Sequence, residues 1–144
     1  MRWWRIGSER IGEELVRSFT QVPLLISQGI DEQRPEINAS PRIVVATAGA
    51  QPDAESGYAT LIIPSAAALA SRPELWAPEE ALRRWLTTAA LVRPQGQIWV
   101  SAGLDQPLAQ ALIRWNPDEY IQRILDERQV LRFPPTASIV AIDG

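Results

Sequence analysis

Short apolar runs alternate with helical patterns along this chain, and this alternation constrains its fold more than any other feature. The clearest runs are RIVVAT at 42–47 and YATLII at 58–63. Nearly continuous apolar strands of this length are typical of parallel strands that are covered on both faces. Further strands are expected at 2–6, 23–27, 97–102 and 138–142. We therefore expect an α/β fold with a mostly parallel sheet flanked by helices.

Helices are predicted in the intervening stretches. They are expected after Gly7, at 65–71, from Pro78 onward, at 106–114 and at 117–131. In the helix from Pro78, Leu82 and Trp85 share an apolar face. On its other face, Glu79 with Arg83 and Glu80 with Arg84 have the spacing of i,i+4 ion pairs. The polar segments 28–41 and 48–57 are expected to be loops.

Three residue types are absent from the 144-residue sequence: cysteine, histidine and lysine. Without them the chain has no disulfide, thiol nucleophile, imidazole base or phosphate-loop lysine. No calcium-loop spacing is present either, so we expect no metal site, no catalytic residues and no cofactor-binding residues in this chain. Net charge is −3, which argues against tight electrostatic binding of nucleic acid by the chain alone. No apolar run is long enough to span a membrane and no signal peptide is recognisable, so a cytoplasmic location is expected.

The segment DERQVLRFPP at 126–135 is the most specific motif in the sequence. It resembles the segment that ends the second helicase lobe of PriA-type primosomal proteins N′, the replication restart helicase family. GSERIGEELVRSFT, RIVVATAGAQP and PEEALRRWLTTAALVRPQGQIWV fall in the same order as weaker motifs of that family. The resemblance covers nearly all of the chain.

This resemblance implies a RecA-like second helicase lobe with a P-loop NTPase fold over residues 1–133. Residues 134–144 would then begin a following, truncated C-terminal domain. The family uses ATP with Mg²⁺ and carries a zinc module, both implied only for regions upstream of this chain. Its partners would be forked or single-stranded DNA and proteins of the primosome, with no membrane involved.

The chain departs from the family pattern where the motor chemistry is expected. In an active enzyme, arginines of the last motif stabilise charge on the γ-phosphate, and losing one costs roughly 10³-fold or more in rate. Here the two arginine positions are Val92 and Gln95, Arg93 is out of register by one, and Thr88 replaces the motif's glutamine. These departures resemble the divergent actinobacterial members of the family, whose helicase motifs are degenerate.

Two residues are candidates for contact with nucleic acid or phosphate, Thr47 and Arg93. Thr47 is what remains of the earlier DNA-contacting motif, and the alternative is an ordinary threonine at the end of a strand. Arg93 is the remaining cation of the arginine motif. Its alternative is a solvated arginine beside a helix C-terminus, where the helix dipole favours positive charge.

Six tryptophans raise the possibility of base stacking. Trp85 and Trp99 lie in an apolar helix face and an apolar strand, so both are predicted to be core residues. Trp3, Trp4, Trp76 and Trp115 remain open between the two roles.

Three functional hypotheses follow. In the first, the parent protein binds DNA and serves as a scaffold in replication restart, and this lobe does not hydrolyse ATP. In the second, the parent is a working ATP-dependent DNA helicase in which other residues replace the lost arginines. A third hypothesis, an unrelated α/β binding module, requires the similarity at 126–135 to be accidental.

Overall fold

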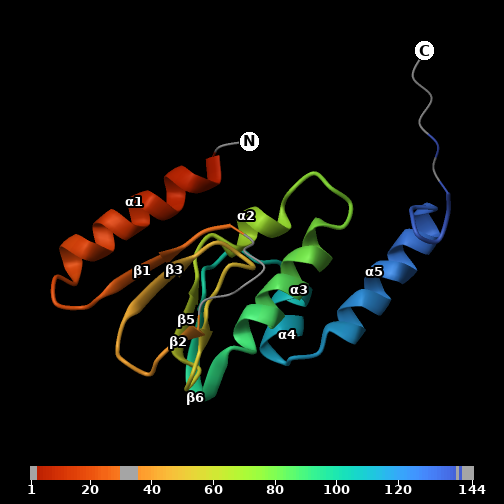
Figure 1. The fold of residues 1–144 in the computed structure, drawn as a ribbon. Coiled ribbons are helices and arrows are strands. Elements are labelled where there is room, and N and C mark those ends of the chain that lie inside the picture. The colour runs from red at the N-terminus through yellow and green to blue at the C-terminus, as the bar shows by residue number, and fades with distance from the viewer. Residues whose placement is uncertain (1–2, 30–35, 139, 141–144) are drawn as a thin grey trace. The chain divides into compact units, whose positions relative to one another are not determined.

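The computed structural model describes the backbone of residues 3–29, 36–138 and 140, with side chains from residue 10 onward. Five helices and six strands occur in the described residues (Figure 1). The helices are α1 (Trp3–Ser18), α2 (Ala66–Ala70), α3 (Ala77–Ala89), α4 (Gln106–Ile113) and α5 (Pro117–Leu131). The strands are β1 (Leu24–Ser27), β2 (Glu36–Ile37), β3 (Ile43–Ala46), β4 (Asp53–Ala54), β5 (Tyr58–Ile63) and β6 (Val92–Val100).

The expected α/β class is confirmed, although the strands do not form one continuous ladder. Among the described residues, β1 pairs with β3, β2 with β4 and β5 with β6 in three two-stranded sheets. The first two pairs are parallel. In the third, the Tyr58 N–H donates to the Leu91 carbonyl and the Ser101 N–H donates to the Ile63 carbonyl. Because bonds link both the starts and the ends of these strands, β5 and β6 also run parallel.

The first predicted strand is wrong, because the chain is helical from Trp3 to Ser18. The β-propensity of two tryptophans is a weak, context-dependent preference. Once a helix is nucleated, each added residue contributes a hydrogen bond, so the helix extends through this stretch. The expected loops also contain two short strands, β2 and β4. The predicted strand at 138–142 falls largely outside the described residues, and Ser138 and Val140 are not in a strand.

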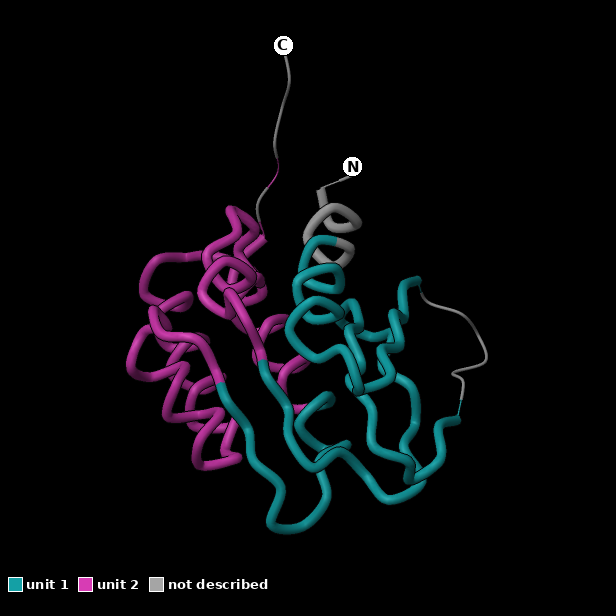
Figure 2. Tube along the Cα trace, turned by 90° about the vertical axis from the view of Figure 1, so that its left-hand side faces the viewer, with its two compact units in different colours: residues 1–62, 87–99 teal, residues 63–86, 100–144 magenta. Residues whose placement is uncertain are grey.

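The chain divides into two compact units, coloured separately in Figure 2. Unit 1 comprises residues 1–62 and 87–99, and unit 2 comprises residues 63–86 and 100–144. In unit 1, α1 packs on β1 and β3. Gly12 lies at this contact, where an added Cβ would be 3.0 Å from Ile26 Cδ1. That approach leaves little room for any larger residue on this face of α1.

Unit 2 contains a hydrophobic core of buried side chains. Leu82 and Leu108 are fully buried there, and the predicted core residue Trp85 is only 4% exposed. The remaining buried members of the cluster are Ala66, Ala81, Ala111, Leu112 and Tyr120. The 3.6-residue spacing of α3 and α4 brings these side chains to one interior, so the amphipathic pattern of α3 is confirmed.

Candidate nucleic-acid interface

Thr47 lies at the carboxyl end of the β1–β3 ladder in unit 1. Its N–H donates to the Ser27 carbonyl (3.1 Å), and its carbonyl accepts from the Ala50 N–H (2.9 Å). The Ser27 hydroxyl donates to the Ala50 carbonyl at 2.6 Å, which closes the turn against β1. The end of a parallel strand is a common place for ligand contacts in α/β proteins. Thr47 is half-buried in this turn.

Gln51 connects this turn to the end of α3. Its Oε1 accepts from the Gly49 N–H, and its Nε2 donates to Thr88 Oγ1, both at 3.0 Å. Gly49 has φ +96°, a conformation that favours glycine. The structure therefore joins the two segments in which the resemblance to PriA-type proteins implies separate motifs. Gln51 was not predicted as a site residue, because its only signal in the sequence is a long amide side chain after a turn of small residues.

Arg93 lies near the start of β6, where its side chain is exposed. Its backbone packs on Gly57, where an added Cβ would be 3.0 Å from Arg93 N. Arg93 lies four positions after Ala89, the last residue of α3, in a part of the chain that is extended from Val92 onward. Gln95 lies within β6 with φ +66°.

Charge is sparse around these two candidates. In the segments 47–51 and 88–95, Arg93 is the single charged residue. The Thr47 backbone is hydrogen-bonded to β1, whereas the Arg93 backbone packs against Gly57. In the part of the chain that the structure describes, no hydrogen bond joins the side chains of Thr47 and Arg93. The arrangement therefore offers one exposed cation and several neutral polar groups, and it does not form a cradle for a phosphate chain.

The tryptophans differ sharply in their surroundings. Trp85 is a core residue, but Trp99 is 60% exposed, so the prediction of a core role for Trp99 is wrong. The reason is the two-residue alternation of a strand, since Val100 packs on the unit 2 core and Trp99 points to the opposite face. Trp76 and Trp115 are exposed as well. The side chains of Trp3 and Trp4 lie outside the described residues.

At least one residue of the motif at 126–135, Arg128, makes structural contacts within unit 2. Arg128, on α5, forms an ion pair with Glu79, on α3, and its Nη2 donates to the Leu75 carbonyl at 2.7 Å. We call this group of Arg128, Glu79 and the Leu75 carbonyl the α3–α5 clasp. Its two side chains are only 12% and 18% exposed, and Glu79 Oε2 is buried without a hydrogen-bond partner.

The predicted pairing of Glu79 with Arg83 is therefore wrong. Glu80 instead receives both neighbouring arginines, at 2.7 Å from Arg83 and 2.6 Å from Arg84. Hydrogen bonds from Arg83 and Arg84 to its carboxylate lower the pKa of Glu80 to about 2. The i,i+3 and i,i+4 spacings allow both contacts on one helix face.

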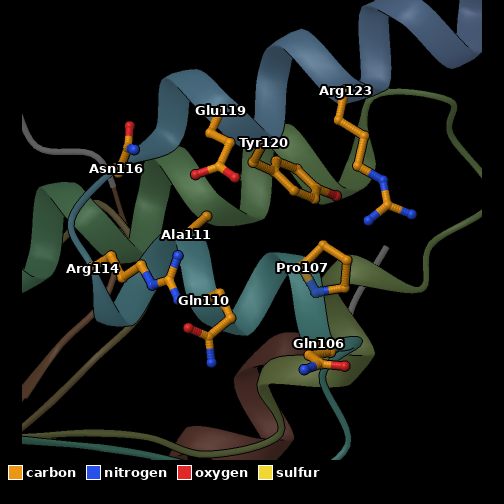
Figure 3. Close-up of a pocket in the computed structure, with 9 residues that line it drawn as sticks. All are labelled: Gln106, Pro107, Gln110, Ala111, Arg114, Asn116, Glu119, Tyr120 and Arg123. Atoms are coloured by element: carbon orange, nitrogen blue, oxygen red, sulfur yellow. The ribbon is translucent and has the colours of Figure 1, made fainter.

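A shallow groove lies between α4 and α5 (Figure 3). Two arginines, Arg114 and Arg123, line it together with the Tyr120 ring. Glu119 also lines it, and Arg123 forms an ion pair with Glu127 at 3.0 Å. These carboxylates offset the positive charge, so the groove is not suited to binding phosphate. Burial and the nearby Asp105, Glu79 and Glu127 carboxylates raise the pKa of Tyr120 to about 12.

Metal binding and membrane crossing are two further possibilities for the described residues. No group of three or more acidic, histidine or cysteine side chains that could hold a metal ion occurs among them. Within the same residues, no helix combines the length and the apolar character that a membrane crossing requires.

The chain is similar to a segment of several mycobacterial proteins, each named probable replication restart protein PriA. It is 42% identical to the Mycobacterium leprae protein and 41% identical to those of Mycobacterium tuberculosis (strain CDC 1551 / Oshkosh) and Mycobacterium bovis. Each match extends over 142 residues, 96% of this chain and 22% of the relative. No family model and no solved structure matches. The resemblance to PriA-type proteins is confirmed, and the chain is homologous to about a fifth of their length.

Proposed function

We propose that this chain acts as one part of a PriA-like replication restart protein, in a DNA-binding and scaffold role, and does not take part in ATP hydrolysis. The observation that carries the proposal is the contact between Gln51 and Thr88. It packs the two degenerate motif segments together through a neutral hydrogen bond, beside a single out-of-register arginine. The similarity to mycobacterial PriA proteins supports the replication restart role.

The fold that we propose for this part is the RecA-like second lobe over residues 1–133, with residues 134–144 opening a following domain. Parallel strand pairs and α/β connectivity support the assignment. The short share of each relative that the chain matches is in keeping with one lobe of a larger protein.

The residues present do not fit a nucleotide phosphate site. Stabilising the charge of a transferring phosphoryl group requires cations aimed at its oxygens. Val92 is apolar and half-buried, Gln95 is neutral, and the chain contains no lysine. We therefore assign no step of ATP hydrolysis to this chain.

One observation favours the alternative, a lobe of a functional ATP-dependent DNA helicase with nonstandard residues. Arg93 is exposed on β6, so its guanidinium is accessible to a group outside this chain. Under the alternative, replacing Arg93 with alanine would reduce ATP hydrolysis by roughly 10³-fold, the usual effect of losing such an arginine.

The test is to measure fork binding and ATP hydrolysis on one preparation of the full protein that contains this chain. We expect salt-dependent binding of a labelled forked DNA and no increase in ATP hydrolysis when the fork is added. Fork-stimulated hydrolysis that is lost in the Arg93→Ala variant would replace the proposal with the helicase alternative. Absence of fork binding at low salt would overturn the DNA-binding role itself.

A further inference from the structure

The exposed face of β5 and β6 carries an unusual combination of side chains. Trp99 is 60% exposed and Ile62 is 67% exposed. The bond from the Ser101 N–H to the Ile63 carbonyl sets the register at this end of the ladder. In a parallel ladder it places residue 62 beside residue 99, with both side chains on one face. Trp99 and Ile62, with Gln97 two residues before Trp99, form what we call the β6 face.

Gln97 contacts the polar edge of the Trp99 ring. The indole Nε1–H donates to Gln97 Oε1 at 3.4 Å, a long bond between two side chains on the same side of the strand. It satisfies the polar edge of the ring and leaves the rest of the indole largely exposed to solvent. The Gln97 amide keeps its two N–H donors for another acceptor.

The charge of these strands is opposite in sign to that of the whole chain. No aspartate or glutamate occurs in residues 56–73 or 81–104, and the charge on β5 and β6 is the single positive charge of Arg93. Arg93 and Trp99 are six positions apart in the sequence, at most about 20 Å along an extended strand. The positive φ of Gln95 bends this stretch. A cation therefore precedes an exposed aromatic ring along one strand.

We propose that the β6 face binds single-stranded nucleic acid by stacking an unpaired base on Trp99, with Gln97 hydrogen-bonding to the base and Arg93 contacting a backbone phosphate. This inference rests on the proposed DNA-binding function and assigns it a specific site. Exposed aromatic rings on a sheet beside a positive charge are a general means of binding single strands. An apolar protein partner would need neither the amide donors nor the cation.

The experiment measures binding of a fluorescein-labelled oligothymidylate to the full protein that contains this chain, by fluorescence anisotropy at low salt. Trp99→Ala is expected to weaken binding on the order of 10-fold, because it removes one stacking surface. Trp99→Phe, which keeps a ring, is expected to retain most of the affinity. Trp76→Ala is the matched control, since Trp76 is equally exposed but lies in unit 2.

An oligonucleotide with abasic sites separates stacking from phosphate contacts. The loss of bases should weaken binding by the wild-type protein much more than binding by Trp99→Ala. Arg93→Gln should instead reduce the slope of log affinity against log salt by about 0.7, the value for one phosphate contact on a single strand.

Several results would overturn the inference while leaving the proposed function in place. The first is binding of the fork without binding of oligothymidylate. The second is an equal oligothymidylate affinity for wild type and Trp99→Ala. The third is an equal loss of affinity for the abasic oligonucleotide in both proteins. If Trp99→Ala lowers the midpoint of thermal unfolding and leaves the oligonucleotide affinity unchanged, then Trp99 packs against other parts of the protein and does not bind nucleic acid. Failure to bind both the fork and the single strand would overturn the DNA-binding proposal as well.

Discussion

The turn at 47–51 and the α3–α5 clasp differ in how closely their sequence signals match their chemistry. The turn and Thr88 lie where the resemblance to PriA-type proteins implies DNA-contacting and arginine motifs, and neutral hydrogen bonds hold them together. The clasp lies in the most specific motif of the sequence, yet its charges pair with each other and with a backbone carbonyl. The most specific motif therefore contributes an internal packing contact, whereas under the proposed function the turn is a place where motor chemistry has been lost.

The largest effect is expected from breaking the clasp. Arg128→Ala leaves the Glu79 carboxylate largely buried and without its cation, which should destabilise the protein by about 3–5 kcal/mol. Arg123→Ala is the matched control on the same helix, because its pair with Glu127 is 58% and 52% exposed. That change should cost less than about 1 kcal/mol. Urea unfolding measures both, and equal costs would contradict the structural role of Arg128.

The raised pKa of Tyr120, to which burial and the Glu79 carboxylate contribute, should make the stability of the protein depend on pH. That pKa is about 12 in the folded protein against 10.0 ordinarily. Above pH 10 the unfolded chain loses the phenol proton while the folded chain retains it, so stability falls as pH rises from 10 to 12. The loss should be on the order of 2 kcal/mol. Tyr120→Phe should flatten the profile of unfolding free energy in that window, and an unchanged profile would exclude Tyr120 as its source.

A smaller effect is expected at the turn. Gln51→Ala removes the bonds to the Gly49 N–H and to Thr88 Oγ1 and should cost about 1–2 kcal/mol. Arg93→Gln, at an exposed position, should change stability by no more than about 0.5 kcal/mol. Thermal unfolding of the two variants tests the contrast. A large loss of stability in Arg93→Gln would mean that the arginine has a structural role.

The smallest effect on stability is expected from removing the two ion pairs that Glu80 makes with Arg83 and Arg84. Because the folded pKa of Glu80 is lowered to about 2, from 4.5, its contribution is complete above pH 4.5 and disappears as pH falls toward 2. Solvent screening limits this contribution to about 0.5 kcal/mol. Glu80→Gln should therefore be slightly less stable than wild type at pH 7 and equal to it near pH 2. A difference that persists near pH 2 would point to another cause.

Much of the fold follows from local pattern. The apolar runs of β1, β3 and β5 and the helical spacing of α3, α4 and α5 are short-range signals, and the structure confirms them. Tertiary packing decided the rest. Strand alternation puts Trp99 outside although its strand is apolar, and Glu79 turns from its neighbour Arg83 to Arg128, 49 positions away in the sequence. The contact of Gln51 with Thr88 is also long-range, so no local sequence pattern predicts it.

ATP hydrolysis by the full protein that contains this chain, with and without forked DNA, tests the central claim most directly. If the arginine motif has lost its chemistry, the fork binds and the rate of hydrolysis stays the same. A fork-stimulated rate that falls roughly 10³-fold in Arg93→Ala would contradict that claim and identify Arg93 as the residue that took over the lost role.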